Sequence, residues 1–104
     1  MGNRIRVLKK EPGKKARWVE IENELKPLQE AVGGYLESVT LFEDLVILCD
    51  EEGRLKGLPY NCEICGVTFV GTILICGVEG EEFADLRLSP EAAMALMPDM
   101  EVEA

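Results

Sequence analysis

Cys62 and Cys65, in the stretch "GLPYNCEIC", have the spacing most typical of metal or redox chemistry in this chain. A structural zinc site needs four ligands, commonly as two such pairs about 15 to 20 residues apart, and here there is one pair and no histidine. Cys49 and Cys76 could complete the set, but each lies in a continuous apolar run, where a thiol is usually a small buried hydrophobe. A redox pair normally begins a helix, whereas a strand is expected after Cys65. The sequence therefore predicts no metal, no cofactor, and two cysteines that flank a turn and help fill the core.

Other side chains with catalytic potential are equally sparse. Without histidine a Ser-His or Cys-His nucleophile cannot exist, and Ser89 is expected to cap a helix. Adjacent carboxylates, Glu51 with Glu52 and Glu81 with Glu82, could act as acid and base, but such pairs in turns are more often a solvated face. No glycine-rich phosphate-binding motif occurs in a strand-to-helix context. We therefore expect a protein that is not an enzyme.

The N-terminal half of the chain is expected to form a hairpin, a helix and two strands. "IRVLKK" and "ARWVEIE" alternate apolar and polar residues around "EPGK", where Pro12 and Gly13 suit a type II turn. "NELKPLQEAVGG" has helical spacing, with Asn23 as the expected N-cap and the glycines from Gly33 as its end. "YLESVTL" alternates, and "LVILCD" is continuously apolar, which is typical of a strand in the middle of a sheet.

The C-terminal half adds a loop, further strands and a second helix. "GRLKGLPYN" is rich in turn formers, and in "GVTFVGTILICGV" Gly66 and Gly71 indicate a bulge or a close backbone approach. Ser89 as N-cap and Pro90 at the first helical position predict a short helix that ends before Pro98. We therefore expect residues 1–104 to form a single α+β domain. It has a mainly antiparallel sheet of about five strands, one short helix packed on it, a short C-terminal helix, and an acidic tail that frays from about residue 98.

The composition is that of a small globular domain. At 104 residues with 47% hydrophobic side chains, the chain can bury one core. The longest apolar runs fall short of the roughly 20 residues that cross a bilayer, and no charged-then-apolar leader opens the chain. Four cysteines without a secretory signal indicate reduced thiols. We therefore expect a cytoplasmic protein with no membrane contact.

Charge is distributed unevenly along the chain. Residues 1–17 carry seven lysines or arginines against Glu11, which is +6. The remaining residues carry four basic and nineteen acidic groups, which is −15 and gives the net charge of −9. Phosphate binding depends on basic side chains, so this overall acidity disfavours direct binding of nucleic acid. A basic protein partner is expected instead.

Three stretches, "IENELKPLQEAVGGYLESV", "DEEGRLKGLPYN" and "GTILICGVEGEEF", resemble a small family known only as a domain of unknown function. The family is found in bacteria and on their plasmids and phages. The resemblance covers roughly residues 4 to 88, and the "GRLKGLPYN" loop is its most specific part. It implies a mobile-element context, in which small acidic proteins often neutralise host defences, and it supplies no catalytic residues.

The first functional hypothesis is a non-enzymatic inhibitor of a host defence enzyme directed at nucleic acid, such as a CRISPR effector or a restriction nuclease. Its acidic side chains would imitate phosphates and occupy the basic nucleic-acid-binding groove of that enzyme. The family resemblance and the polarised charge together favour this anti-defence hypothesis. The expected partner-binding residues are Glu79, Glu81, Glu82 and Asp85.

Two alternatives stay open. A nucleotide or another small anion could bind the 54–61 loop through Arg54, Lys56, Tyr60 and Asn61. Nucleic acid could contact the basic N-terminal hairpin through Lys9, Lys10, Lys14, Lys15 and Arg17. Each set also has a purely structural interpretation: a solvated acidic surface, an ordinary loop, or an edge hairpin whose lysines discourage strand pairing.

Overall fold

The computed structural model describes residues 3–89, 91–92, 95 and 101–103. The predicted α+β class and the single short helix packed on an antiparallel sheet are confirmed. Among the described residues, no helix has the length and apolar character needed to cross a bilayer. In chain order the elements are β1 (Arg4–Lys10), β2 (Arg17–Glu22), α1 (Leu25–Val32), β3 (Leu36–Phe42), β4 (Leu45–Asp50), β5 (Tyr60–Ile64), β6 (Val67–Val70), β7 (Ile73–Glu79) and β8 (Glu82–Ala84).

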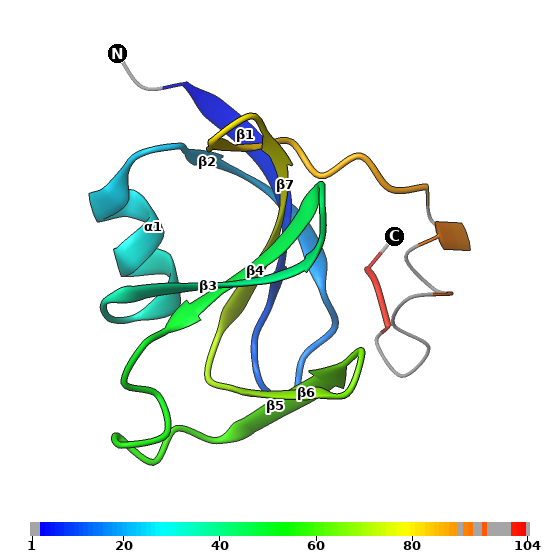
Figure 1. The fold of residues 1–104 in the computed structure, drawn as a ribbon. Helices are drawn as coiled ribbons and strands as arrows, with labels where there is room; N and C mark the ends of the chain where they lie inside the picture. The colour runs from blue at the N-terminus through cyan, green and yellow to red at the C-terminus, as the bar shows by residue number, and fades with distance from the viewer. Residues whose placement is uncertain (1–2, 90, 93–94, 96–100, 104) are drawn as a thin grey trace.

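The main sheet has six strands in the order β2-β1-β7-β4-β3, with β8 paired to β7 (Figure 1). All of its named pairs are antiparallel. The apolar segment "LVILCD" forms β4, which is buried throughout and lies between β7 and β3, so its predicted central position is confirmed. The predicted sheet of about five strands did not include β8, whose three residues are too short to show an alternating pattern.

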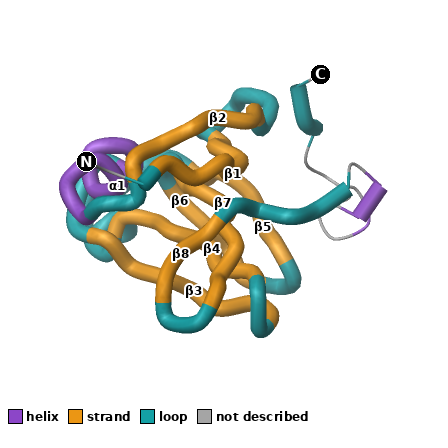
Figure 2. Tube along the Cα trace, turned by 90° about the horizontal axis from the view of Figure 1, so that it is seen from above, coloured by secondary structure: helices purple, strands orange, loops and turns teal. Residues whose placement is uncertain are grey.

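Alternating side chains give the sheet two apolar faces. On one face Leu28 and Val32 of α1 pack with Val7, Leu74 and other β-strand residues. On the opposite face Ile47 and Ile75 pack with Ile64 and Phe69 of the separate β5–β6 hairpin. Figure 2 shows α1 on one side of the strands, and the loop that follows β8 runs toward the other side. The sheet is therefore covered on both sides.

The predicted N-terminal hairpin is confirmed. β1 and β2 pair from Arg4 with Glu22 to Lys9 with Arg17. The Lys14 amide donates to the Glu11 carbonyl at 3.1 Å, and Gly13 has a φ of 74°, as the third residue of a type II turn requires.

The start of α1 differs from the prediction. Glu24, not Asn23, occupies the N-cap position, and it makes no side-chain capping bond. The Asn23 side chain instead donates from Nδ2 to the Phe83 carbonyl at 2.8 Å, which joins the approach to the helix to β8. The helix ends at Gly33 in the left-handed conformation, as predicted. The Asn23 side chain, which the local pattern predicted as the N-cap of the helix, therefore makes a long-range hydrogen bond instead.

The region of the cysteine pair also needs a correction. β5 begins at Tyr60, inside the predicted loop, and Cys65 with Gly66 forms the two-residue turn to β6. Their φ values of 50° and 80° match a type I′ hairpin turn. Cys62 packs half-buried against the core, but Cys65 lies exposed in the turn itself. The pair therefore does not flank the turn, and Cys65 does not fill the core.

At the C-terminus, most of the predicted helix after Pro90 lies outside the described residues, and no such helix is among the elements given above. The Ala92 amide does donate to Ser89 Oγ at 3.1 Å. Where the sequence predicts a frayed tail, residues 101–103 pair with Ala16: the Ala16 amide donates to the Glu101 carbonyl, and the Glu103 amide donates to the Ala16 carbonyl. Val102 between them packs on the core, which explains the attachment.

Candidate functional site

The strongest concentration of exposed carboxylates that strands hold in place is the turn between β7 and β8. Glu79 is paired with Glu82 across the hairpin, and Gly80 with Glu81 forms its tip. Together with Asp85, which follows β8, these are the four acidic residues predicted for partner binding, and all four are exposed. We call Glu79, Glu81, Glu82 and Asp85 the acidic hairpin. The structure brings all four together.

The position of β8 fixes the hairpin rigidly to the sheet. Gly77 of β7 pairs with Leu45 of β4 on one side and with Ala84 of β8 on the other. Two residues earlier in β7, Ile75 pairs with Leu8 of β1 on the side that β8 occupies beside Gly77. β8 and the residues after it therefore lie between β7 and the diverging start of β1. The Arg6 amide donates to Asp85 Oδ1 at 2.7 Å, and the Leu86 amide donates to the Arg6 carbonyl.

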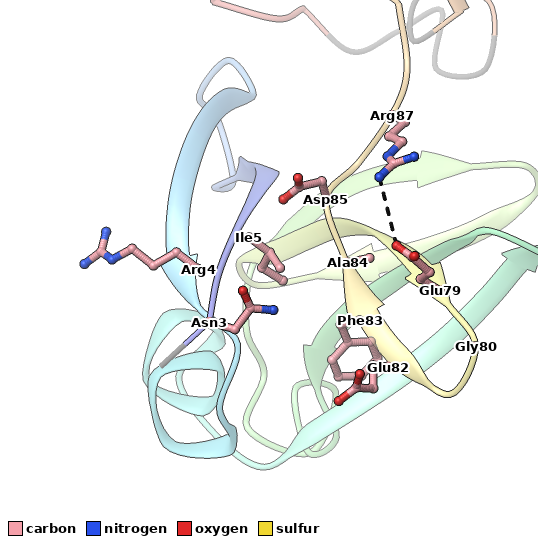
Figure 3. A pocket seen from close by; sticks show the side chains of 10 residues that line it. All are labelled: Asn3, Arg4, Ile5, Glu79, Gly80, Glu82, Phe83, Ala84, Asp85 and Arg87. Carbon is pink, nitrogen blue, oxygen red and sulfur yellow. Dashed lines mark ion pairs between the residues drawn. The ribbon is translucent and has the colours of Figure 1, made fainter. Parts of the chain in front are cut away.

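A groove of about 480 Å³ borders the acidic hairpin on the β1 side (Figure 3). Glu79, Glu82, Phe83 and Asp85 line it, while the Arg4 side chain extends away from the hairpin in this view. Arg87 approaches Glu79 at 4.0 Å, but both side chains are more than three-quarters exposed, so the pair contributes little. The charged residues that line the groove are three acids, Glu79, Glu82 and Asp85, and two arginines, Arg4 and Arg87.

The sequence reasoning missed Asp44, which joins this surface from the β3–β4 turn. Its carbonyl accepts the Val78 amide at 3.2 Å, and it lines a second groove of about 340 Å³ with Glu79, Asp85 and Arg87. Asp44 is far from the hairpin along the chain. Only the pairing of β4 with β7, which sets Leu45 opposite Gly77, brings it there.

The basic residues of the N-terminal hairpin are largely engaged within the protein. The Lys10 side chain is buried, and its Nζ donates to Asn61 Oδ1 at 3.1 Å and to the Glu11 carbonyl at 2.9 Å. Lys15 approaches Glu101 at 3.5 Å. Lys10 is therefore unavailable to an external phosphate.

Glu11 gathers three of the remaining cations. Its carboxylate lies 3.0 Å from Lys14 Nζ and 3.7 Å from both Lys9 Nζ and Arg17 Nη2. The hydrogen bond from Lys14 is the main cause of a lowered pKa for Glu11, with the charges of Lys9 and Arg17 acting in the same direction. One acid thus offsets part of the basic charge at the tip of this hairpin.

The candidate ligand residues of the 54–61 loop are also used by the fold. Arg54 Nη2 donates to the Thr68 carbonyl at 3.0 Å, and Lys56 Nζ lies 2.7 Å from Asp50 Oδ2. Asn61 is buried, and its Nδ2 donates to the carbonyls of Lys10 and Gly71. Tyr60 is exposed. Arg54 and Lys56 line different grooves, so the structure does not bring these four side chains to one pocket.

A family model described as a domain of unknown function, DUF3846, matches residues 5–95. The chain belongs to the DUF3846 family. No curated protein matches it, and no solved structure does. The matched range contains nearly all of β1 and every later element of this DUF3846 domain, including the acidic hairpin.

The network around Asp50 explains how the stretch "DEEGRLKGLPYN" is held in this DUF3846 domain. The Asp50 side chain is 1% exposed, and its Oδ1 accepts the Glu52 amide at 2.9 Å. Its Oδ2 accepts from Lys56, whose Nζ also donates to the Gly33 carbonyl at 3.2 Å. A Cβ on Gly34 would collide with the Asp50 carboxylate. The motif therefore holds the loop against the end of α1.

This network predicts an acid-sensitive contribution to stability. Burial raises the pKa of Asp50, but hydrogen bonds from Lys56 and the Glu52 amide outweigh it, so the pKa is lowered from 3.8. A lowered folded-state pKa gives stability that is present above the unfolded value and is lost as pH falls through the folded value. We expect the difference in unfolding free energy between the parent and Asp50→Asn to shrink as pH falls below about 4. Urea unfolding between pH 6 and pH 2 measures it, and a constant difference would contradict the assignment.

The four cysteines of the DUF3846 domain do not converge. Cys49 and Cys62 pack on the face covered by the β5–β6 hairpin, whereas Cys76 packs on the face covered by α1. Burial raises the pKa of Cys76 to about 12, and burial together with the Glu37 carboxylate raises that of Cys49 to about 11. Both thiols are therefore protonated at neutral pH and are poor nucleophiles and metal ligands.

Proposed function

We propose that this DUF3846 domain is a non-enzymatic interaction protein that uses the acidic hairpin to occupy the basic groove of a nucleic-acid-binding enzyme. The target class that fits the bacterial, plasmid and phage setting of the family is a host defence enzyme, such as a CRISPR effector or a restriction nuclease. The carboxylates would take the places of phosphates on the enzyme's lysines and arginines.

One observation carries the proposal: the acidic hairpin is exposed at the surface, whereas each competing set has one member, Lys10 or Asn61, in the interior. Glu79 and Glu82 are fixed in register by β7 and β8, so binding through them would cost little ordering of the chain. Lys10 and Asn61, in contrast, are buried against each other, and Lys56 is held by Asp50. These contacts weaken both the nucleic-acid and the small-ligand alternatives.

The proposal predicts that charge reversal on the acidic hairpin weakens partner binding. In Glu79→Lys/Glu81→Lys/Glu82→Lys, affinity for a retained defence enzyme should fall on the order of tenfold or more, because three favourable contacts become repulsive. Binding by the parent should also weaken with rising salt, since exposed charges are screened over about 8 Å at physiological ionic strength. The measurement is calorimetry against purified enzymes first found by pull-down from cells that carry defence systems.

A matched control is Glu20→Lys/Glu24→Lys/Glu30→Lys, which makes the same change in net charge at exposed positions on β2 and around α1. It should retain most of the affinity, whereas an equal loss would show that net charge alone matters. A gel-shift series with single-stranded RNA and duplex DNA at low salt tests the opposite hypothesis. Tight binding by the free protein would refute nucleic-acid mimicry, because a mimic repels the molecule it imitates.

A further inference from the structure

The outer edge of β3 is a row of backbone groups that no described strand covers. β3 pairs only with β4, and it is the last strand of the main sheet on that side. The Glu51 amide donates to the Tyr35 carbonyl, so residue 35 directs its carbonyl toward β4. Backbone direction alternates along a strand, and therefore Leu36, Ser38 and Thr40 direct their amides and carbonyls outward.

This edge carries few of the devices that usually protect an edge strand. Lysines, prolines and inward-pointing charges block pairing with another chain. β3 has no lysine and no proline, and Glu37 is its one charged residue. A register shift between Thr40 and Phe42 marks a bulge at its far end, which limits regular pairing to residues 36–40. The opposite edge strand, β2, carries Arg17, Glu20 and Glu22.

A small groove lies beside the free edge. It has a volume of about 160 Å³ and runs from Glu37 and Val39 of β3 to Val67 and Phe69 of β6, with Arg54 at its border. Arg54 is already bound to the Thr68 carbonyl. Every second side chain of an added strand would lie on this face, where the Glu37 carboxylate could accept a basic head group and Val39, Val67 and Phe69 could contact its aliphatic stem.

Charge indicates what kind of strand would pair there. From Pro27 to Gly53 the chain has no lysine or arginine and seven acids, which are Glu30, Glu37, Glu43, Asp44, Asp50, Glu51 and Glu52. β3 lies in the middle of this stretch. A second copy, with its net charge of −9, would be repelled, whereas a basic segment would be attracted.

We infer that the edge of β3 accepts an extended segment of a partner protein with alternating basic and apolar residues, by strand addition. The added backbone would bond with Leu36, Ser38 and Thr40, and its basic side chains would lie beside Glu37. This surface is separate from the acidic hairpin and does not depend on the proposed function.

The test uses the full chain and a capped five-residue peptide, Lys-Val-Lys-Val-Lys, followed by backbone NMR. We expect hydrogen exchange of the amides of Leu36, Ser38 and Thr40 to slow on the order of tenfold at saturating peptide, because each amide gains an acceptor. The Val39 amide, which faces β4, should change little. A peptide of the same sequence with alternate amides methylated has the same charge and should not slow exchange.

Ser38→Pro is the matching protein variant. It removes an outward-facing donor without removing a bond to β4, and proline is tolerated on an edge strand. Peptide affinity should fall about tenfold, the melting temperature should change little, and Ser38→Ala should bind as the parent does. Equal binding of the methylated peptide, an equally tight Glu-Val-Glu-Val-Glu peptide, or a parent dimer whose β3 amides are already protected would each overturn the inference. So would the absence of binding.

Discussion

Asn61→Ala is expected to lower the free energy of unfolding by about 3 kcal/mol, because it leaves several buried polar groups without partners at once. The Asn61 side chain accepts from Lys10 Nζ and donates to the carbonyls of Lys10 and Gly71 at 2.8 and 2.6 Å. It therefore joins β5 to β1 and to the link between β6 and β7. Loss of this side chain should reduce the melting temperature by more than 10 °C, at about 4 to 8 °C per kcal/mol for a domain of this size.

The Asn61 prediction is checked by urea unfolding followed by circular dichroism. Lys10→Met is the partner variant, since it removes the buried ammonium but keeps an apolar stem of similar length. In the double variant the two losses should be less than additive, because the residues share a hydrogen bond. Additive losses would contradict a shared network. A stable Asn61→Ala protein would instead return Asn61 to the candidate ligand residues of the 54–61 loop.

Gly77→Ala is expected to destabilise the protein by about 3 kcal/mol, at the upper end of the usual cost of overpacking. A Cβ on Gly77 would overlap the carbonyl oxygen of Asp85, and its remaining near neighbours there are also backbone atoms. Neither strand can move aside easily, because Gly77 is also opposite Leu45 in β4. The residues after β8 should therefore separate from the sheet.

Local and global effects of Gly77→Ala can be measured separately. Amide exchange of Leu86 should accelerate more than that of Ile47, since the Leu86 amide bonds to the Arg6 carbonyl in the segment that is displaced. Gly57→Ala is a suitable control, because a Cβ there meets open space and its φ of 67° adds only the left-handed strain of about 1 to 2 kcal/mol. An equal loss in both variants would mean that contact with Asp85 is unimportant.

The acidic hairpin also depends on the contact at Gly77. Asp85 accepts the Arg6 amide, and β8 holds Glu82 opposite Glu79. If the proposed function is correct, Gly77→Ala should weaken partner binding while all four acidic residues remain in the sequence. The side chains would be present, but their spacing would no longer be fixed.

Local sequence patterns were sufficient to predict the α+β class: alternation of apolar and polar residues predicted the β1–β2 hairpin, and a continuous apolar run predicted the buried β4. These features depend on contacts between near neighbours in the chain, or on burial, which a continuous apolar run such as "LVILCD" indicates without further information. Gly13 and Gly33 were predicted for the same reason, because a positive φ is a local requirement. The four acids predicted for partner binding lie together at one turn, and their binding role stays a prediction.

Only the tertiary structure decided which polar residues are available at the surface. Lys10 and Asn61 were both candidates for binding an external ligand, yet 51 positions separate them and they bond to each other in the interior. Asn23 had the pattern of a helix cap, but the carbonyl of Phe83, 60 positions away, is its acceptor. Asp44 reached the acidic surface through the pairing of β4 with β7. A composition or a local period does not encode these partners, because strand order and register are set by burial across the whole sheet.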